Sequence, residues 1–510
     1  MRRIITITGL ALALGSGAAA QSLVETKQYE DGGVYEGTFL NGLQHGQGTY
    51  TLPNGYQYSG EWFEGEIRGQ GTARFPNGSV YVGQFAAGKP HGIGKITFAD
   101  GGTYEGEWVE GQITGNGRAV YANGVVYEGQ FRNAMHHGQG KMTAPSGYVY
   151  DGDWVNGVKE GTGVITYPDG AVYTGELSGG ERNGEGKLEM PDGLVYEGTW
   201  VDGQIEGKGR LVQPNGDVYE GDLVGGKRQG TGKVTYANGD VYEGGFLNDK
   251  RHGQGTFRGA DGYTYVGSWV AGQIEGQGEV TYPDGSVYVG SFKGGLADGR
   301  GTITYPDGST YSGEWSEGVI EGEGVATYPN GLVYEGNFKG AKNHGFGKMT
   351  YADGYTYEGN WVEGEREGYG VATYADGTVY RGCFKDGQRH VTATETCVGP
   401  DGEIVSVGEI VMPPPAAEVA AAAAAGDPPP RGFSYVGEWR NGEIDGRGVA
   451  TYATGDVYEG TFRAGRRQGE GTMRYADGQV AEGDWQDGAL VTRTGGADTA
   501  PATDEAASAD

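Results

Sequence analysis

The histidines are the residues of this chain whose type and spacing first suggest chemistry. Six of the seven share one position of a repeating pattern: His45, His91, His137, His252, His344 and His390. Histidines at a fixed phase suggest a metal site, but in a stack of hairpins any two of these would lie at least two repeats apart, roughly 19 Å at the spacing of β-strands. One ion cannot be shared across that distance. We therefore expect solvated turn histidines, and no metal or other cofactor.

Cys383 and Cys397 are the only cysteines. Two cysteines in an exported chain predict a disulfide, and a redox-active pair is less favoured because there is no Cys-x-x-Cys motif. Cys383 stands where the repeating pattern begins to fail, since Val391 and Ala393 replace expected glycines. The bridge would tie the end of a repeat array to the irregular segment after it, as a cap does in other solenoids.

No catalytic constellation stands out from the repeats. Gly253-Gln254-Gly255 has the form of a phosphate-binding loop, but such a loop must open a helix and nothing helical follows. The Asp-Gly turns offer one carboxylate each, so calcium binding has no further support. The sequence shows no nucleophile elbow, metalloprotease motif, kinase signature or paired-carboxylate motif. We predict a protein that is not an enzyme.

The element that must position all these residues is a repeat of 23 residues, typified by the stretch from Val195 to Gly209. Its tyrosine, taken as position 0, recurs at a constant spacing through sixteen copies: Tyr35, Tyr58, Tyr81, Tyr104, Tyr127, Tyr150, Tyr173, Tyr196, Tyr219, Tyr242, Tyr265, Tyr288, Tyr311, Tyr334, Tyr357 and Tyr380. The pattern resumes at Tyr435 and Tyr458, and a last copy has Ala481 instead. A fixed period of this length indicates a stacked repeat array.

Each copy has the pattern of a β-hairpin. Alternation places Tyr196, Gly198 and Trp200 on one face of a strand and Glu197 with Thr199 on the other. A turn follows at positions +6 and +7, and a two-residue turn pairs +4 with +9. Carried across that turn, the same count puts the glycines at +2, +11 and +13 on the aromatic face, where they would leave room for rings to lie flat.

The stretch Tyr-Glu-Gly-Thr-Trp-Val-Asp-Gly-Gln-Ile-Glu-Gly-Lys-Gly from Tyr196 resembles the membrane occupation and recognition nexus (MORN) repeat. The resemblance covers about residues 34–394 and 432–490, and suggests a secreted bacterial type. It implies an all-β fold: an elongated, single-layer antiparallel β-meander of about 19 hairpin repeats.

A second period of 46 residues is superimposed on the first. Trp and Phe or Leu alternate at +4, with one phase slip at Leu223 and Phe246. The residues at +8 to +10 alternate with them, so acidic and basic hairpin tips are neighbours. Opposite charges on adjacent hairpins favour the correct register, because a shift by one copy would place like beside like. The alternative is a docking surface for a partner with a matching repeat.

The N-terminus and the charge indicate where the chain works. Two arginines, an apolar run and three alanines predict a signal peptide over residues 1–20 with cleavage between Ala20 and Gln21, and hence a periplasmic or secreted protein. No later stretch is long and apolar enough for a transmembrane segment. A net charge of −30 repels phosphate backbones, so nucleic acid is excluded as a partner.

The remaining boundaries follow from composition. We expect an N-terminal lead-in over residues 21–33, a main array of sixteen repeats over 34–397 with a disulfide-closed end, and a Pro/Ala-rich linker over 398–431. Three C-terminal repeats, the last degenerate, occupy 432–492, and a disordered tail occupies 493–510. The sequence leaves open whether the C-terminal repeats dock on the main array.

These features predict a scaffold for protein–protein interaction or self-assembly in the cell envelope, with the homo-oligomer as one form. The alternative is a binder of envelope lipid headgroups or glycans through the aromatic face. Self-packing of the rings is the competing fate for that face. The candidate interaction face is Tyr58, Trp62, Tyr104, Trp108, Tyr150, Trp154, Tyr196, Trp200, Tyr265, Trp269, Tyr311, Trp315, Tyr357 and Trp361.

Overall fold

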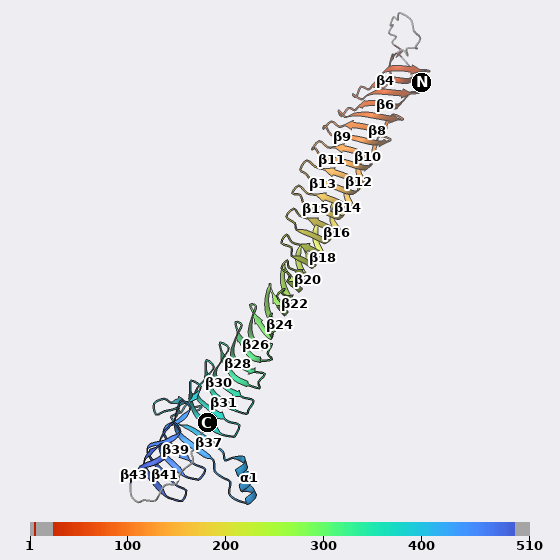
Figure 1. Cartoon of the computed structure of the whole chain (residues 1–510). Helices are drawn as coiled ribbons and strands as arrows, with labels where there is room; N and C mark the ends of the chain where they lie inside the picture. The colour runs from red at the N-terminus through yellow and green to blue at the C-terminus, as the bar shows by residue number, and fades with distance from the viewer. Residues whose placement is uncertain (1–4, 7–23, 495–510) are drawn as a thin grey trace. The chain divides into compact units, whose positions relative to one another are not determined.

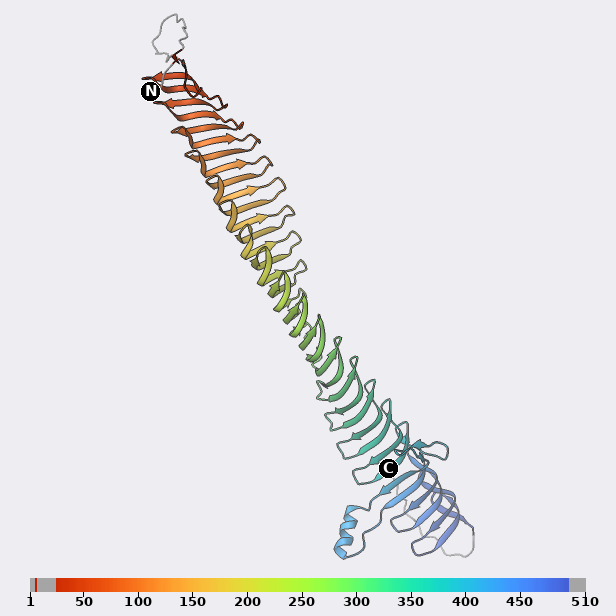
Figure 2. The same cartoon turned by 180° about the vertical axis from the view of Figure 1, so that it is seen from behind.

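The computed structural model describes residues 5–6 and 24–494, and within them the protein is all-β apart from one short helix. The chain divides into two compact units, an N-terminal unit ending at Lys250 and a C-terminal unit beginning at Arg251. In each unit the hairpins follow one another in chain order as a single antiparallel layer, which Figure 1 and Figure 2 show from opposite sides. The predicted β-meander of 23-residue hairpins is confirmed.

The N-terminal unit begins with β1 (Ile5–Thr6) and β2 (Glu25–Gln28), so part of the predicted lead-in is a strand paired with β3. The first strands of its repeats are β3 (Val34–Leu40), β5 (Gln57–Phe63), β7 (Val80–Ala86), β9 (Thr103–Val109), β11 (Val126–Arg132), β13 (Val149–Val155), β15 (Val172–Ser178), β17 (Val195–Val201), β19 (Val218–Val224) and β21 (Val241–Leu247). The second strands are β4 (Leu43–Thr51), β6 (Glu66–Arg74), β8 (Lys89–Thr97), β10 (Gln112–Val120), β12 (Met135–Thr143), β14 (Val158–Thr166), β16 (Glu181–Glu189), β18 (Gln204–Val212) and β20 (Lys227–Thr235).

The C-terminal unit repeats the same arrangement. Its first strands are β23 (Thr264–Val270), β25 (Val287–Lys293), β27 (Thr310–Ser316), β29 (Val333–Lys339), β31 (Thr356–Val362), β33 (Val379–Lys385), β38 (Phe433–Arg440), β40 (Val457–Arg463) and β42 (Val480–Gln486). The second strands are β22 (Lys250–Arg258), β24 (Gln273–Thr281), β26 (Leu296–Thr304), β28 (Val319–Thr327), β30 (Lys342–Thr350), β32 (Glu365–Thr373), β39 (Glu443–Thr451), β41 (Arg466–Arg474) and β43 (Ala489–Arg493). Between β33 and β38 lie β34 (Gln388–Arg389), β35 (Cys397–Val398), β36 (Ile404–Val405), β37 (Gly408–Met412) and helix α1 (Ala416–Ala425).

The hairpin turn and its first pairs are those that the sequence predicts. Trp200 pairs with Ile205, which joins +4 to +9. Asp202 and Gly203 occupy the turn with φ of 47° and 79°. Two successive positive φ angles define the turn whose twist matches that of the flanking strands, and Gly at the second position adopts it without steric cost.

One prediction about the glycines is wrong. Gly198 at +2 and Gly209 at +13 lie opposite each other on the aromatic face as expected, but the register shifts between Gly198 and Trp200. This β-bulge places Gly207 at +11 outside the aromatic face, with φ of 80° and a virtual Cβ that would meet the Thr199 side chain. Glycine is therefore needed at +11 because the backbone of the bulge has a positive φ there, and not because a ring packs over it.

The sheet continues across the predicted Pro/Ala-rich segment. The second strand of the sixteenth repeat stops at Arg389, the chain makes an excursion, and β37 then returns to pair with β33 on one side and β38 on the other. Residues 408–412, inside the segment expected to be a linker, are thus a strand of the C-terminal unit. The question that the sequence left open is answered here, because the last three repeats extend the same sheet.

Two expected features fall largely on residues that the structure does not describe. The predicted signal peptide and its cleavage site at Ala20 and Gln21 lie outside the described residues, apart from Ile5 and Thr6. The predicted tail lies outside them after Thr494. Within the described ranges, no helix has the length and apolar character needed to cross a membrane.

Candidate interaction face

The tyrosine at position 0 lies flat across the two glycines of its own hairpin. A Cβ on Gly209 would lie 2.5 Å from Cε2 of Tyr196, and a Cβ on Gly198 would lie 2.6 Å from its hydroxyl oxygen. The Tyr196 hydroxyl donates a hydrogen bond of 2.9 Å to the carbonyl oxygen of Thr199. The ring is fully buried, and this burial raises the pKa of Tyr196 to about 12. The glycines are therefore the floor on which the ring rests.

The aromatic residue at +4 links each copy to the one before it. The Trp200 indole nitrogen donates to the carbonyl oxygen of Gly186, 3.3 Å away in the preceding repeat. Its ring makes edge-to-face contacts with Tyr173 and Tyr196, at centroid distances of 5.4 Å and 5.3 Å. Edge-to-face pairs at this distance are favourable beyond the area they bury. Within each unit, tyrosines and +4 residues thus alternate along the sheet as a packed row.

The structure places each of the fourteen residues of the predicted interaction face in the aromatic row of its own unit. Thirteen of them are buried, the seven tyrosines at 0–2% exposure and six of the tryptophans at 2–7%. Trp315 is the exception, since its side chain is half-buried. The rings are buried against one another, so most of the aromatic surface of this face is used in packing within the chain.

Side chains at +9 cover the tryptophans, a role that the sequence did not reveal. The Arg182 guanidinium lies 4.0 Å from the ring centroid of Trp200 in the next repeat. The same stacking joins Arg251 to Trp269, Arg389 to Trp439 and Arg467 to Trp485, at 4.2, 4.6 and 4.7 Å. A cation over an indole face is attracted by the ring quadrupole. Because a basic side chain at +9 of one copy packs on the tryptophan at +4 of the next, the two residue types alternate together. Packing between neighbouring copies therefore explains part of the 46-residue period.

His136, the seventh histidine, occupies the same +9 position. Its ring stacks on Tyr127 at 3.7 Å and contacts Trp154 at 4.8 Å, while its Nε2 lies 2.6 Å from the Tyr121 hydroxyl. Burial lowers the pKa of His136 to about 4. This histidine is neutral at pH 7 and serves as a planar packing element.

Three of the histidines at +10, His45, His137 and His390, accept a backbone hydrogen bond at a hairpin tip, whereas Nδ1 of His344 is buried without a partner. His390 is itself buried, so the expectation of solvated histidines is wrong there. Nδ1 of His45 and of His137 accept backbone amide hydrogens from the turns of the following copies, at 3.5 Å and 3.4 Å. In acidic copies a carboxylate takes this place, as where Glu206 accepts from the Gly225 amide at 3.0 Å. Position +10 therefore caps the next turn. In the described part of the chain, no group of three or more His, Cys, Asp or Glu residues could hold a metal ion.

Charged side chains at the hairpin tips pair with carboxylates in the turn of the next copy, at +6 or +7, and not with the residues at +8 to +10 that the alternation led us to expect. Arg228 lies 3.4 Å from Asp249 in the next copy, and Lys342 lies 3.8 Å from Glu363. Both pairs are at least partly exposed, so each contributes little to stability. These ion pairs contribute mainly by favouring the correct register between neighbouring hairpins. The packing of the side chains at +9 favours the same register.

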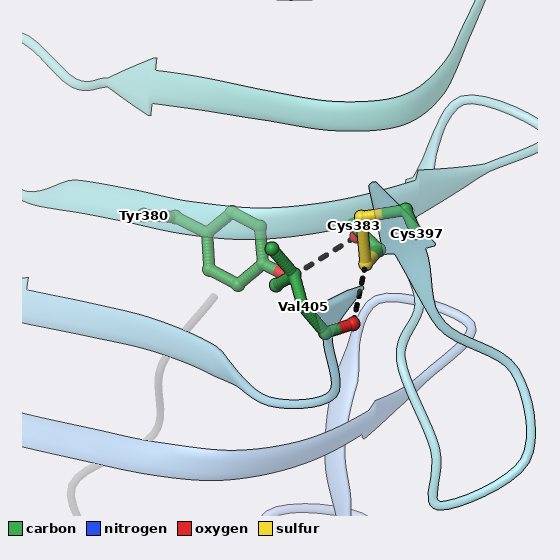
Figure 3. The surroundings of a disulfide bond; sticks show 4 residues. All are labelled: Tyr380, Cys383, Cys397 and Val405. Atoms are coloured by element: carbon green, nitrogen blue, oxygen red, sulfur yellow. Dashed lines mark hydrogen bonds between the residues drawn. A yellow bond between two sulfur atoms is a disulfide. The ribbon is translucent and has the colours of Figure 1, made fainter. Parts of the chain in front are cut away.

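Cys383 and Cys397 form the predicted disulfide, with Cα atoms 5.7 Å apart. Figure 3 shows the bridge beside Tyr380, whose hydroxyl donates to the Cys383 carbonyl oxygen at 3.1 Å. The Cys383 sulfur lies 3.4 Å from the carbonyl oxygen of Val405. The bridge thereby holds the small hairpin of β35 and β36 against β33, at the point where the chain leaves the sheet.

A family model described as MORN repeat matches eighteen segments of the chain. They are residues 35–55, 58–80, 81–103, 104–126, 127–147, 150–172, 173–195, 196–218, 219–241, 242–262, 265–287, 288–310, 311–333, 334–354, 357–379, 380–399, 435–457 and 458–480. These segments include most of the sequence and coincide with the hairpins. No curated protein matches the chain at a significant level.

Solved structures resemble the chain only distantly. The Drosophila melanogaster SAS-4 TCP domain, solved with a proline-rich motif of Ana2, is 18% identical, with 35% of this chain and 90% of that chain covered and a TM-score of 0.21. The Danio rerio CPAP TCP10 domain is 14% identical over 61% and 96%, with a TM-score of 0.13. An inactive virginiamycin B lyase from Staphylococcus aureus is 14% identical over 61% and 96%, with a TM-score of 0.11. Likeness at this level supports no functional argument.

Proposed function

The chain belongs to the MORN repeat family and is a β-sheet scaffold, and from this premise we propose that it binds a protein partner in the cell envelope without catalysing a reaction. MORN repeats suggest protein binding in general. The envelope location rests on the predicted signal peptide and is supported by the disulfide, which forms in oxidising compartments.

One observation carries the proposal: the face lined with tyrosine and tryptophan is filled by the chain's own rings, whereas the opposite face of the first strands presents an exposed side chain at +1. On β17, Glu197 is exposed between the buried Tyr196 and Gly198. The homologous Glu220 and Glu243 repeat this acidic position in the next two copies. These glutamates pair across the strands with Lys187, Arg210 and Lys233, so charges of opposite sign alternate along this face. Such an alternation suits a partner with a matching repeat, and the net charge of −30 over the whole chain favours a basic one.

Capture from envelope extracts tests this proposal, with the full chain as bait. We expect a basic protein to be retained at low salt and released as the ionic strength rises. Neutralising the exposed face with Glu197→Gln, Glu220→Gln and Glu243→Gln should weaken capture. The matched control changes three turn carboxylates, Glu64→Gln, Glu110→Gln and Glu363→Gln, and should leave capture intact. If wild-type bait retains no protein at any ionic strength, the proposal is wrong.

Self-assembly is the second form of the same proposal, and light scattering measures it directly. A molecular mass that rises with protein concentration would support association between copies. A monomeric mass at every accessible protein concentration would exclude self-assembly, and the proposal would then require a different protein as the partner.

Lipid headgroups and glycans remain the alternative ligands, but burial of the rings counts against both, because a ligand stacked on the rings needs them exposed. An acidic surface also repels anionic lipid. Flotation with anionic liposomes, with and without calcium, separates the alternatives: co-flotation would favour the lipid ligand over the protein partner.

A further inference from the structure

Trp315 lacks the cover that the other tryptophans have. Of the nine tryptophans, all within the described residues, eight are buried and Trp315 is half-buried. The difference lies at +9 of the preceding repeat, where Ala297 has the smallest side chain. The other tryptophans follow a larger residue at this position: Arg182, Arg251, Arg389, Arg467, His136, Gln44, Pro90 or Asn343. Ala297 pairs with Phe292 as Arg182 pairs with Leu177, so the backbone register is the same and only the side chain is missing.

The homologous copies show what occupies this position when an arginine is present. The Arg182 guanidinium stacks on Trp200, and its Nη2 donates to the carbonyl oxygen of Gly203 at 2.8 Å. Arg467 repeats both contacts, stacking on Trp485 and donating to the Gly488 carbonyl oxygen at 2.7 Å. An indole face and a turn carbonyl at +7 thus form the two halves of a guanidinium site built into the repeat.

Both halves are present beside Ala297. The Trp315 ring is held in the standard orientation, since its indole nitrogen donates to Gly301 at 3.2 Å and its ring contacts Tyr288 at 5.1 Å. The equivalent turn carbonyl belongs to Gly318, whose own amide donates to the Ala297 carbonyl oxygen at 2.8 Å. A methyl group at Ala297 is too short to reach either half.

The surroundings favour a positive charge. Asp298, the next residue after Ala297, has its Oδ2 3.3 Å from the Glu317 amide at the rim of the same turn. The Glu317 side chain is exposed beside it. The nearest cation in the sequence, Arg300, is already engaged with Glu314 at 3.4 Å. Carboxylates at the rim of this turn attract a cation that binds there.

We propose that Trp315, the Gly318 carbonyl and Asp298 form a docking site for an arginine side chain of a protein partner. This inference rests on the proposed scaffold function and names the chemistry that its partner presents. The partner's guanidinium takes the place that Arg182 holds over Trp200, so the array uses its own packing interaction for recognition at the copy where alanine at +9 leaves the tryptophan half-buried. We call these three groups the Trp315 site.

Fluorine NMR of the full chain labelled with 5-fluorotryptophan tests the site, because each tryptophan gives its own signal and Trp315→Phe identifies that of Trp315. The probe is N-acetyl-arginine methylamide, and the control is N-acetyl-citrulline methylamide, which has nearly the same shape without the charge. We expect the Trp315 signal alone to shift, saturably, with the arginine probe. Ala297→Arg should abolish the shift, and Arg182→Ala should make the Trp200 signal respond as well. The inference is wrong if the Trp315 signal does not shift with the arginine probe, or if it shifts equally with the citrulline probe.

Capture of the envelope partner distinguishes this inference from the scaffold proposal. Ala297→Arg should reduce capture, whereas Asn343→Arg, which adds the same charge at +9 before the already buried Trp361, should not. Equal capture by wild type and Ala297→Arg overturns the role of the Trp315 site in partner binding but leaves the scaffold standing. A shift of the Trp315 signal without any captured protein contradicts the scaffold proposal instead.

Discussion

The Trp439 indole nitrogen donates a hydrogen bond of 3.2 Å to the carbonyl oxygen of Gly408, which lies 31 residues earlier in the chain. In uninterrupted copies the same bond spans 14 residues, as between Trp485 and Gly471. Gly408 therefore takes the place of the missing glycine at +13. Tyr380 and Tyr435 contact the two sides of Trp439 at 5.2 Å and 5.6 Å, so the aromatic row passes through the interruption unbroken.

The disulfide should stabilise this junction. Replacing both cysteines, as Cys383→Ser with Cys397→Ser, releases a loop closed over a separation of 14 residues. We expect a loss of about 2–4 kcal/mol, felt locally, because repeats respond mainly to their neighbours. Hydrogen exchange should accelerate at β37 and β38 and remain unchanged in copies near Tyr265. Uniform exchange across the unit, or no change at β37, would contradict this role.

Much of this fold can be predicted from the residue pattern within a single repeat. The period, the two-residue turn and the pairing of +4 with +9 all follow from residues within one hairpin, where alternation and turn chemistry act over short range. The bulge at Gly207 was missed because a period-2 count cannot show two extra residues. The return of β37 was missed because no 23-residue spacing connects Gly408 to Trp439.

The candidate face was harder to predict for a physical reason. Alternation correctly groups Tyr196 with Trp200, but whether a grouped ring is exposed depends on what the next copy places above it. Arg182 covers Trp200 through a contact between copies, whereas its charge and its position at a hairpin tip suggested a contact with an opposite charge on the neighbouring tip. The sequence shows that position +9 is arginine at Arg182 and alanine at Ala297. Only the register of neighbouring hairpins shows that this position covers the tryptophan of the next copy.

The floor glycines should tolerate no side chain. Gly209→Ala would place a methyl carbon 2.5 Å from Cε2 of Tyr196, and the ring cannot move because its hydroxyl is held by Thr199. We expect destabilisation of about 1–3 kcal/mol, typical of overpacking a core. Ser268→Thr is the control, since it adds one methyl group at +3, where Thr199 shows that the methyl is tolerated. Chemical unfolding with exchange readout compares the two, and equal losses would refute steric crowding as the cause.

The stacked arginines should contribute more than exposed ones. Arg182→Ala removes the guanidinium above Trp200, and we expect a loss of about 0.5–2 kcal/mol together with increased solvent quenching of a tryptophan signal. Arg210→Ala serves as the control, because Arg210 lies 3.6 Å from Glu220 in an exposed pair that contributes little. If both variants lose the same stability, the contribution of stacking is not supported.

Alkaline pH should unfold the array through its tyrosines. Burial raises the pKa of Tyr196 and of Tyr173 from 10 to about 12. Below pH 10 the phenol holds its proton in both states, but between about pH 10 and 12 the unfolded chain releases protons that the folded chain retains. The free energy of unfolding therefore falls as pH rises through this window. Tyrosinate absorbance and circular dichroism should change together, and ionisation of the position-0 tyrosines in an intact sheet would contradict the prediction.

Acidic pH should act through His136. Burial lowers its pKa from 6.5 to about 4 in the folded chain, while the unfolded chain has the ordinary value. Above pH 6.5 the imidazole is neutral in both states; as pH falls toward 4, only the unfolded state gains a proton, so stability is lost across that window. His136→Arg places at +9 the residue that already stacks on Trp200, and its charge does not change with pH. We expect the thermal unfolding midpoint of the wild type to fall further than that of His136→Arg between neutral pH and about pH 4, with exchange near Trp154 reporting the site. Parallel curves for the two proteins would show that His136 takes up its proton without opposing the fold.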